Sequence, residues 1–280
     1  MSALSVVVPC RDRATLLAGS LPALCAALRP GDELVVVDAA SIGRDVQEVA
    51  RAAGAHVIRC SEGGATAARN AGWAAARHDL VAFLDDDCRP EPGWADAVDA
   101  ALGDLDAVCG RMLAEGEGHL SLLDDPQPRD YRLGDDIELF GHGGNLAVRR
   151  PALAAVSGWD PRIGPGTRWP GAEDKDLLLR LLAAGHRAGY RPGPAVRHLQ
   201  WRTRRQVLKA ELGYARGLGA LAVKGRRAGL PAPRVAAATG ASASTTVRDL
   251  RNGYEFGVVT GIVRTGGILW GAATAARKLR

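Results

Sequence analysis

Three consecutive carboxylates, Asp85–Asp87, follow the apolar run Leu80–Leu84 in this sequence of 280 residues. The run predicts a buried strand, and like charges gathered at its end repel one another unless a cation lies among them. Carboxylate oxygens suit a hard divalent cation such as Mg²⁺ or Mn²⁺, and a metal there could hold a diphosphate. The alternative is that the acids cap the next helix, because Pro90 and Pro92 suit a turn and a helix start. The triplet alone favours neither explanation.

A second group of carboxylates stands at the start of a leucine-rich segment. Glu173 and Asp174 open the run Glu-Asp-Lys-Asp-Leu-Leu-Leu-Arg-Leu-Leu, which predicts a helix with acids in its first turn. The helix dipole stabilises acids there, and this is a purely structural explanation. A carboxylate in that position could also act as a general base under a mobile loop, since the glycine- and proline-rich segment 164–171 precedes it.

Two further polar residues are weaker candidates. Asn145 follows two glycines, where the backbone can pass close to a ligand, although a simple tight turn explains the pattern equally well. His198 follows a short strand predicted at 195–197, and a single histidine is more often a structural residue than a ligand. Either residue needs other elements of the fold to bring it to a site.

The first half of the chain alternates short apolar runs with helical stretches. Apolar strands separated by helices are typical of a mostly parallel sheet with helices on both faces. Ligands of such sheets bind beyond the carboxyl ends of the strands. Three of these ends carry polar groups, at residues 9–13, at Asp38 with Ser41, and at 85–87. We predict strands at 4–9, 33–38, 56–59, 80–84 and 107–111, and helices at 13–28, 43–53 and 65–77.

Composition and short motifs narrow the class of protein. A chain that is 47% hydrophobic and 24% charged can build one large core or a main domain with an appendage. The five cysteines have no zinc-type spacing and indicate reduced thiols, and no secretory signal precedes the first strand, so we expect a cytoplasmic protein. The chain lacks the Gly-x-Gly-x-x-Gly, Walker and Gly-x-Ser-x-Gly patterns. This argues against dinucleotide-binding dehydrogenases, P-loop enzymes and serine hydrolases of the α/β type.

Basic residues are concentrated late in the chain. Residues 197–227 contain nine of them and the single acid Glu211, which predicts an anionic partner or surface. Nucleic acid is not expected, because only Trp201 and Tyr214 could stack on bases. A basic amphipathic helix predicted at 203–225 could pack on the main domain, form a homodimer or contact anionic lipid at the inner face of the membrane. Plain packing is the favoured of these three.

The last segments are predicted from composition. Residues 228–246 mix Pro, Gly, Ala, Ser and Thr and are interpreted as a linker. In residues 256–276 only Arg264 is charged, and the segment contains two Gly-x-x-x-Gly spacings, at 257/261 and 267/271. A charge near the centre of a spanning helix costs about 2.5–3.5 kcal/mol on insertion scales, so we predict a packed or interface helix rather than a membrane span.

These segments, in this order and spacing, resemble the inverting GT-A glycosyltransferases of family 2. The resemblance covers residues 4–200 and implies an α/β, Rossmann-like fold with a mostly parallel central sheet and helices on both faces. It implies a donor half near 1–112 and an acceptor and catalytic half near 113–200, followed by a helical C-terminal region at 201–280. The segments that carry it are 5–13, 35–41, 64–72, 83–87, 144–150, 158–160, 173–180 and 196–198.

The resemblance implies transfer of a sugar from a nucleotide-diphospho-sugar donor to an acceptor hydroxyl, with Mn²⁺ or Mg²⁺ as cofactor. Negative charge develops on the leaving diphosphate, and metal and cationic side chains must neutralise it. The acceptor must lose a proton, to a base typically worth about 10²–10⁴ in rate. The implied donor-binding residues are Pro9, Arg11, Asp38, Arg69, Asp85 and Asp86, the metal ligands Asp87 and His198, the base Asp174 with Glu173 as the second choice, and the sugar and acceptor pocket residues Asn145 and Trp159.

The donor and the acceptor stay open. In the family, two acidic or amide residues and then Gly-Ser usually follow the second strand, whereas here Asp38 is followed by Ala-Ala-Ser. A uridine nucleotide is therefore not favoured over thymidine or guanosine. The acceptor could be a glycan, a lipid-linked molecule or a small molecule.

Two other classes of protein share some of these features. A nucleotidyltransferase that forms sugar nucleotides shares the sheet and acidic metal site, but usually has a glycine-rich basic loop after the first strand, which Val8–Arg11 lacks. A noncatalytic nucleotide-sugar-binding protein would be signalled by loss of Asp87 or Asp174, and both are present.

Overall fold

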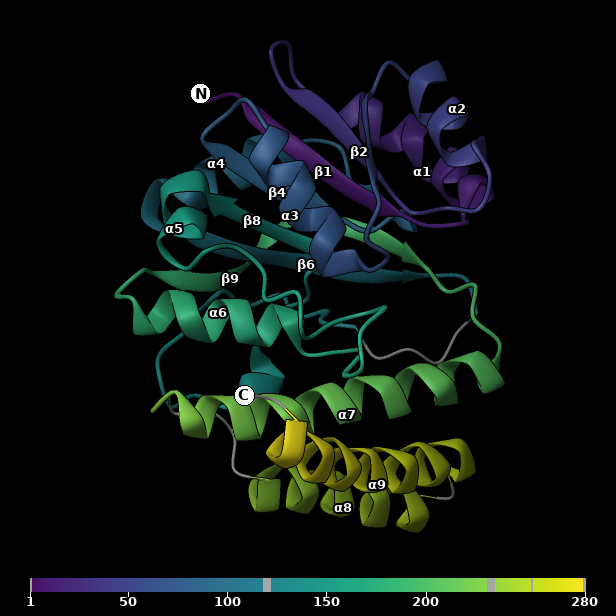
Figure 1. The fold of residues 1–280 in the computed structure, drawn as a ribbon, viewed down its shortest axis with the longest axis vertical. Coiled ribbons are helices and arrows are strands. Elements are labelled where there is room, and N and C mark those ends of the chain that lie inside the picture. The colour runs from purple at the N-terminus through teal and green to yellow at the C-terminus, as the bar shows by residue number, and fades with distance from the viewer. Residues whose placement is uncertain (1, 118–121, 231–234, 253, 279–280) are drawn as a thin grey trace.

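The fold is a central sheet with helices on both faces, as the sequence predicts (Figure 1). The computed structural model describes residues 2–117, 122–230, 235–252 and 254–278. Within these residues the sheet has nine strands, with the order β3-β2-β1-β4-β8-β6-β9-β5 and with β7 beside β9.

The first four strands form the parallel half of the sheet. β1 (Leu4–Cys10), β2 (Glu33–Ala39) and β4 (Leu80–Leu84) are buried along their whole length, while β3 (His56–Cys60) is a partly exposed edge. β1 pairs in parallel with both β2 and β4, and β2 pairs with β3. Burial on both faces explains why these strands are nearly continuous apolar runs. Their carboxyl ends consequently lie at one edge of the sheet.

Helices form a layer on each face of the sheet. Along β1, Val6 and Val8 join one apolar cluster and Val7 joins the other, because successive side chains of a strand point to opposite faces. The cluster with Val6 includes side chains of α1 (Ala14–Ala27), α2 (Asp45–Ala52) and α4 (Trp94–Asp104). The cluster with Val7 includes side chains of α3 (Ala65–Ala75), α5 (Arg150–Ala155) and α6 (Glu173–Ala183).

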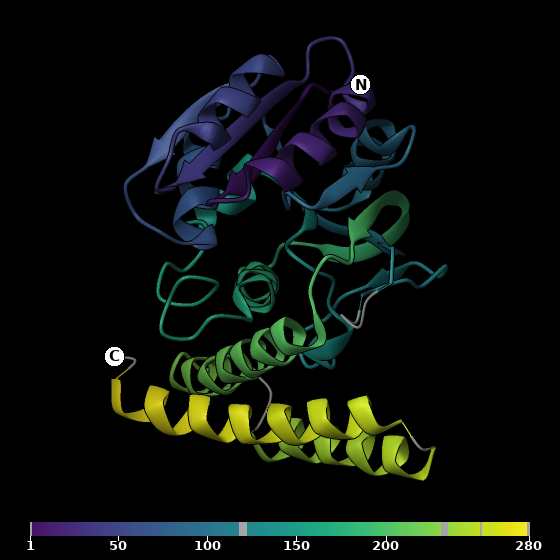
Figure 2. The same ribbon diagram turned by 90° about the vertical axis from the view of Figure 1, so that its right-hand side faces the viewer.

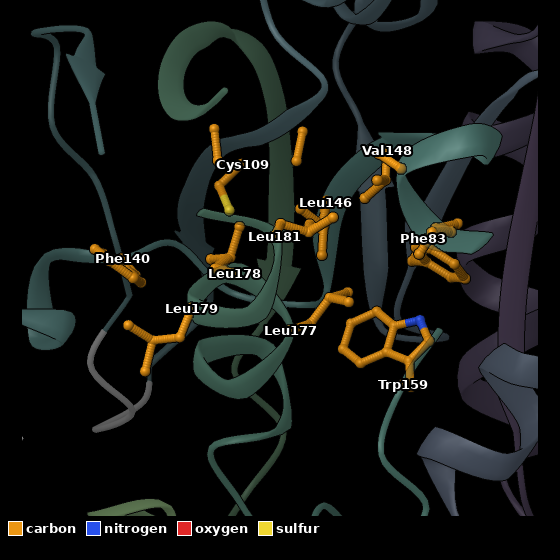
Figure 3. Packing of buried hydrophobic residues seen from close by; sticks show 14 of the residues in the cluster. Phe83, Cys109, Phe140, Leu146, Val148, Trp159, Leu177, Leu178, Leu179 and Leu181 are labelled. Carbon is orange, nitrogen blue, oxygen red and sulfur yellow. The ribbon is translucent and has the colours of Figure 1, made fainter. Parts of the chain in front are cut away.

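α6 packs a dense leucine surface against the sheet. Leu177, Leu178 and Leu181 are fully buried, and Figure 3 shows them beside sheet residues such as Leu146. Trp159 lies at the edge of the same cluster, with its ring 5.2 Å from that of Phe83 in an edge-to-face arrangement. This packing fixes α6, and so it fixes the two carboxylates in its first turn.

The second half of the sheet mixes strand directions. β8 (Asn145–Arg149) runs antiparallel between β4 and β6 (Ala107–Glu115), while β6 and β9 (Ala188–Leu199) are parallel. The remaining elements are β5 (Cys88–Pro90), β7 (Arg129–Asp130) and the short 3₁₀ helix η1 (Ile137–Leu139).

Two local details differ from the patterns in the sequence. The acidic triplet does not cap the next helix, which was one of the two explanations left open for it, because the short strand β5 comes first and pairs antiparallel with β9, and α4 begins only at Trp94. His198 lies inside β9 rather than after a three-residue strand, and it stands opposite Cys88. This pairing depends on residues more than a hundred positions apart, which local sequence patterns do not encode.

Three long helices follow the sheet. In both views α7 (Arg204–Arg227) lies between the sheet and the pair formed by α8 (Val235–Arg251) and α9 (Glu255–Lys278) (Figures 1 and 2). We call these three helices the C-terminal layer. The linker predicted at 228–246 is wrong from residue 235 onward, where α8 begins. Its Ala, Ser and Thr residues form no strong apolar stripe, so contacts with α9 stabilise this helix more than local propensity does.

Small residues let the helices of the C-terminal layer approach closely. A Cβ atom at Gly219 of α7 would lie 2.1 Å from the carbonyl oxygen of Ile268, and one at Gly271 of α9 would lie 2.0 Å from that of Arg216. A Cβ at Gly261 would lie 1.9 Å from Thr246 Oγ1 of α8. The glycines that the sequence places four residues apart are therefore used within the chain.

Two alanine substitutions on α9 should separate this packing from helix propensity. Gly271→Ala should destabilise the protein by about 1–3 kcal/mol, because the new methyl group meets backbone that cannot move aside easily. Gly266→Ala is the matched control, since a Cβ there meets nothing within 4 Å. It should stabilise the helix by about 0.5–1 kcal/mol. Urea unfolding of the full chain measures both, and equal effects would contradict close α7–α9 packing.

Candidate active site

The loops after β1 and β2 are tied together at the carboxyl edge of the sheet. The backbone N–H of Asp12 donates to Ser41 Oγ at 2.9 Å, and the N–H of Ile42 donates to Asp12 Oδ1 at 2.7 Å. Asp12 and Ala40 both have left-handed backbone, with φ of 53° and 58°. Such conformations cost energy for residues other than glycine and are common at functional sites.

The predicted donor-binding residues of these loops differ in exposure. Asp38 is fully buried, and its carboxylate accepts hydrogen bonds from Gln47 Nε2 at 2.7 Å and from Arg59 at 2.6 Å. Burial opposes ionisation, but hydrogen bonds from Ser41 and Gln47 outweigh it and lower the pKa of Asp38. Pro9 is buried within β1. Arg11 is exposed, and its guanidinium lies against Gly63 in the loop that leads to α3.

Arg69 of α3 is the centre of the buried charge cluster. Its guanidinium donates to Asp85 Oδ1 at 2.8 Å and to Glu173 Oε1 at 3.1 Å. The same group lies 4.7 Å from the centre of the Trp159 ring, within the range of a cation–π interaction. Arg69 is 3% exposed, so these contacts take place largely out of water. The fold thus brings together four of the residues that the sequence singles out.

The two neighbouring carboxylates of α6 have opposite pKa shifts. Burial, with the adjacent charge of Asp174, raises the pKa of Glu173 to about 7. Burial also acts against ionisation of Asp174, but the Lys175 cation and hydrogen bonds lower the pKa of that carboxyl. Asp174 Oδ2 accepts from the N–H of Gly143 at 3.1 Å, and Oδ1 accepts from the N–H of Lys175 at 2.8 Å. Asp174 is therefore ionised at neutral pH and held in one orientation.

Trp159 and Asn145, the predicted sugar and acceptor pocket residues, are both buried. Trp159 is held by Asn70, which accepts from its backbone N–H at 2.9 Å and donates to its carbonyl at 2.8 Å. Asn145 Nδ2 donates to the carbonyls of Arg111 and Pro194, and its Oδ1 accepts from Trp94 Nε1. Both ends of this amide are thus engaged by protein groups.

Asn145 stabilises an irregularity in the sheet. The pairing of β6 with β9 shifts register between Gly110 and Arg111, and the amide of Asn145 bridges the two strands at that point. A Cβ at Gly110 would lie 2.1 Å from the carbonyl of Pro194, so only glycine fits there. This placement favours a structural role for Asn145 over contact with a sugar.

Asp86 points into the protein beneath the site. It is fully buried and forms an ion pair with Arg13 at 2.9 Å. Burial raises the pKa of Asp86 to about 7 in spite of Arg13. The side chain of Asp86 is therefore enclosed within the protein, whereas that of the preceding residue, Asp85, is partly exposed.

Asp87 and His198 face each other across the β5–β9 pairing. His198 Nε2 lies 3.5 Å from Asp87 Oδ1, both side chains are almost completely buried, and Asp87 Oδ1 has no hydrogen-bond donor. The other oxygen, Oδ2, accepts from Trp201 Nε1 at 2.7 Å. An unpartnered carboxylate oxygen facing an imidazole nitrogen at this distance fits one divalent cation held by both.

The chain offers a partial set of metal ligands here. Among the described residues, no three acidic, histidine or cysteine side chains converge on one point. Mg²⁺ is commonly held by one or two carboxylates together with substrate phosphates and waters. Asp87 and His198 therefore fit a cation that needs the donor to complete its coordination.

Trp201 is a residue of this site that the sequence reasoning missed. Its ring lies 4.5 Å from the Arg202 guanidinium and 5.8 Å from that of Arg13. Through its hydrogen bond to Oδ2 it orients Asp87, whose Oδ1 then faces His198. The signal in the sequence is a tryptophan next to an arginine, three residues after the candidate ligand His198.

Comparison with known proteins identifies the family. A family described as "Glycosyl transferase family 2" matches residues 5–156, which is more than half of the chain. The chain belongs to this glycosyltransferase family. A pre-mycofactocin glycosyltransferase of Mycobacterium tuberculosis is 31% identical over 172 residues, covering 58% of this chain and 35% of that protein. The chain thus spans about a third of the length of the curated relatives it matches.

Solved structures show that this family 2 glycosyltransferase has the GT-A fold. A mannosyltransferase of Pyrobaculum calidifontis, in complex with GDP-Man and Mn²⁺, has a TM-score of 0.63 at 18% identity, over 99% of this chain and 76% of that one. S. aureus TarS 1–349 in complex with UDP-GlcNAc has a TM-score of 0.58 at 16% identity, over 77% of this chain and 66% of that one. At these identities the likeness establishes the fold.

The structural role of Asn145 leads to a prediction. Asn145→Ala removes three hydrogen bonds from buried partners and should lower the free energy of unfolding by about 1–3 kcal/mol or more. Nucleotide affinity of the folded variant should stay within about twofold of wild type. Denaturant unfolding and calorimetric titration measure the two effects. A large loss of nucleotide affinity with unchanged stability would show instead that Asn145 contacts the substrate.

Proposed function

We propose that this glycosyltransferase is a metal-dependent, inverting enzyme that moves a sugar from a nucleotide-diphospho-sugar to an acceptor hydroxyl. The observation that carries the proposal is the unpartnered Asp87 Oδ1 facing His198 Nε2, beside the charge cluster of Arg69. Asp87 follows β4, His198 lies in β9, and the candidate base Asp174 lies in the first turn of α6. Arg69 connects the end of β4 with α6, since it contacts both Asp85 and Glu173. The complexes with GDP-Man and UDP-GlcNAc support a nucleotide-sugar donor of this type.

Asp87 and His198 would hold the cation at the diphosphate. Bound there, Mn²⁺ or Mg²⁺ would supply positive charge where the leaving group becomes more negative. Arg13 and Arg202 flank Asp87, with nitrogens 3.6 Å and 4.0 Å from Oδ2. These cations add to the positive potential on the same side. The chain thus concentrates its charge where the nucleoside diphosphate departs.

Asp174 is the proposed general base. A base has to be ionised before it can take a proton, and hydrogen bonds and Lys175 keep Asp174 in that form. Its neighbour Glu173 forms an ion pair with Arg69 and is more deeply buried. Glu173 would therefore position Arg69 and Asp85, while Asp174 takes the proton of the acceptor hydroxyl. Attack from the face opposite the leaving group inverts the anomeric centre.

The remaining properties are proposed at the level the residues allow. The Asp38 carboxylate already accepts hydrogen bonds from Gln47, Arg59 and Ser41. Exposed neighbours such as Arg59 are therefore better placed than Asp38 to contact the nucleobase. We keep thymidine, guanosine and uridine sugars as donor candidates. The division into a domain at 1–200 and a helical region at 201–280 also stays a proposal.

Removal of the metal ligand tests the donor site. Asp87→Ala should abolish Mn²⁺-dependent binding of nucleoside diphosphates while unfolding stays cooperative, because the unpartnered oxygen is lost. Asp104→Ala, at an exposed position on α4, is the matched control and should bind as wild type does. Isothermal titration with UDP, GDP and TDP, with and without EDTA, measures this. Unchanged, EDTA-insensitive binding would overturn the metal assignment.

A finer variant tests how Asp87 is oriented. Trp201→Phe keeps an aromatic ring between the two arginines and removes the N–H that binds Oδ2. Mn²⁺ affinity in the presence of nucleotide should fall by about 10–100-fold, as is typical for groups that orient a metal ligand. Trp270→Phe, on the far helix α9, should leave that affinity unchanged.

The choice of base is tested by turnover and its pH dependence. Asp174→Asn should lower kcat by about 10² or more with little change in donor affinity, because size and hydrogen bonding are largely kept. If Asp174 is the base, protonation of the base should not limit kcat/KM between pH 5 and 8, since its pKa is lowered. Glu173, with a pKa of about 7, gains a proton as pH falls through 7. If kcat/KM fell tenfold per pH unit below pH 7 and the Glu173→Gln variant were inactive, Glu173 would be the general base.

A further inference from the structure

α9 has apolar side chains on two opposite faces. One face packs inside the C-terminal layer, where Ile268 is fully buried and Gly271 contacts α7. On the other, Val259, Ile262 and Leu269 are 45%, 62% and 53% exposed. Their spacing of three and then seven residues places them along one side of the helix. This second side of α9 is therefore apolar, and nothing in the described chain covers it.

The exposed apolar residues are concentrated in the C-terminal layer. Of the ten large apolar side chains that are exposed in the described part of the chain, seven lie between residues 247 and 270. Scattered single apolar residues are normal on a protein surface, but a local group of this kind marks an interaction site. We call this group the apolar face: Val247, Leu250, Tyr254, Val259, Ile262, Leu269 and Trp270.

The charge of the same region is strongly positive. Residues 201–280 contain 15 Lys and Arg against 3 Asp and Glu, a net charge of +12. Residues 1–200 contain 21 against 28, a net charge of −7. The modest total of +5 thus hides an acidic catalytic part and a basic helical part. A basic surface of this size attracts an anionic partner.

Two arginines of α7 contact aromatic rings of α9. The guanidinium of Arg216 lies 4.2 Å from the centre of the Trp270 ring, and that of Arg204 lies 5.6 Å from the Phe256 ring. Arg204 also lines a shallow pocket with Tyr254 and Val259. Aromatic rings beside basic residues are typical of elements that lie at the boundary between lipid chains and headgroups.

A bilayer surface explains these features better than a second copy of the chain. Two copies of the segment 201–280, each with a net charge of +12, would repel each other across a symmetric interface, whereas anionic headgroups complement them. By length and mean hydropathy, 1.3, α9 alone among the described helices could also cross a membrane. However, Arg264 near its middle forms ion pairs with Glu138 and Glu211. Gly267 and Gly271 are packed against α7, and Gly261 is packed against α8. A spanning α9 would have to break these contacts.

We propose that the apolar face docks peripherally on an anionic lipid bilayer, with the basic side chains of the C-terminal layer at the headgroups. α7 begins three residues after Trp201, which contacts Asp87, so the layer is joined directly to the candidate metal site. Docking would hold that site near the membrane surface. The binding itself does not depend on which donor or acceptor the enzyme uses.

Vesicle flotation with the full chain tests the proposal. Wild type should float with vesicles of phosphatidylcholine containing phosphatidylglycerol, and not with phosphatidylcholine alone, and the association should weaken as salt is raised. The double variant Ile262→Asp with Leu269→Asp should bind at least tenfold more weakly. Leu133→Asp is the matched control, since Leu133 is 46% exposed outside the C-terminal layer, and it should bind as wild type does.

Charge and oligomer measurements complete the test. Arg248→Glu with Arg251→Glu should weaken association with anionic vesicles by about fivefold or more for each basic residue lost. All variants change exposed positions, and unchanged thermal unfolding midpoints should confirm that they fold. Equal binding to neutral and anionic vesicles, or no binding, would overturn the proposal. So would a wild-type dimer that Ile262→Asp with Leu269→Asp dissociates, or extraction of the protein from membranes by detergent only.

Discussion

The buried guanidinium of Arg69 is the interaction on which the site depends. It joins Asp85, at the end of β4, to Glu173, at the start of α6, and it rests on the ring of Trp159. Buried carboxylates without a cation would repel one another or take up protons, so this one side chain lets three elements meet. Loss of the guanidinium would leave the buried Glu173 and the partly exposed Asp85 without the cation that both of them contact.

The same balance separates the acids by function. Asp174 and Glu173 are neighbours, yet their pKa values are shifted in opposite directions. Hydrogen bonds and the Lys175 cation lower the pKa of Asp174, whereas burial and the adjacent charge of Asp174 raise the pKa of Glu173. The Oδ1 atom of Asp87 has no hydrogen-bond donor and faces His198. Carboxylates with different environments can hold a metal, support a neighbour and take a proton within one small region.

The C-terminal layer shows how close packing can leave a surface for a partner. Glycines bring α9 against α7, and this uses the small side of the helix, so larger apolar residues such as Ile262 and Leu269 remain outside. Arg264, which argues against a membrane span, is neutralised within the protein by Glu138 and Glu211. Packing, charge and exposure together agree with contact at a membrane surface.

Local patterns in the sequence were enough to predict the order of strands and helices in the first half and the family. They also predicted that one group of acids follows β4 and that another opens α6. Each is encoded within a few residues, by runs of apolar side chains and by turn or cap residues. The tertiary structure alone decided that Trp201 orients Asp87, 114 residues away, and that the Asn145 amide bridges two strands. It also decided that α8 is a helix, since its weak local preference is completed by contacts with α9. These outcomes depend on pairs of residues distant in sequence, and no local pattern specifies which side chains will meet.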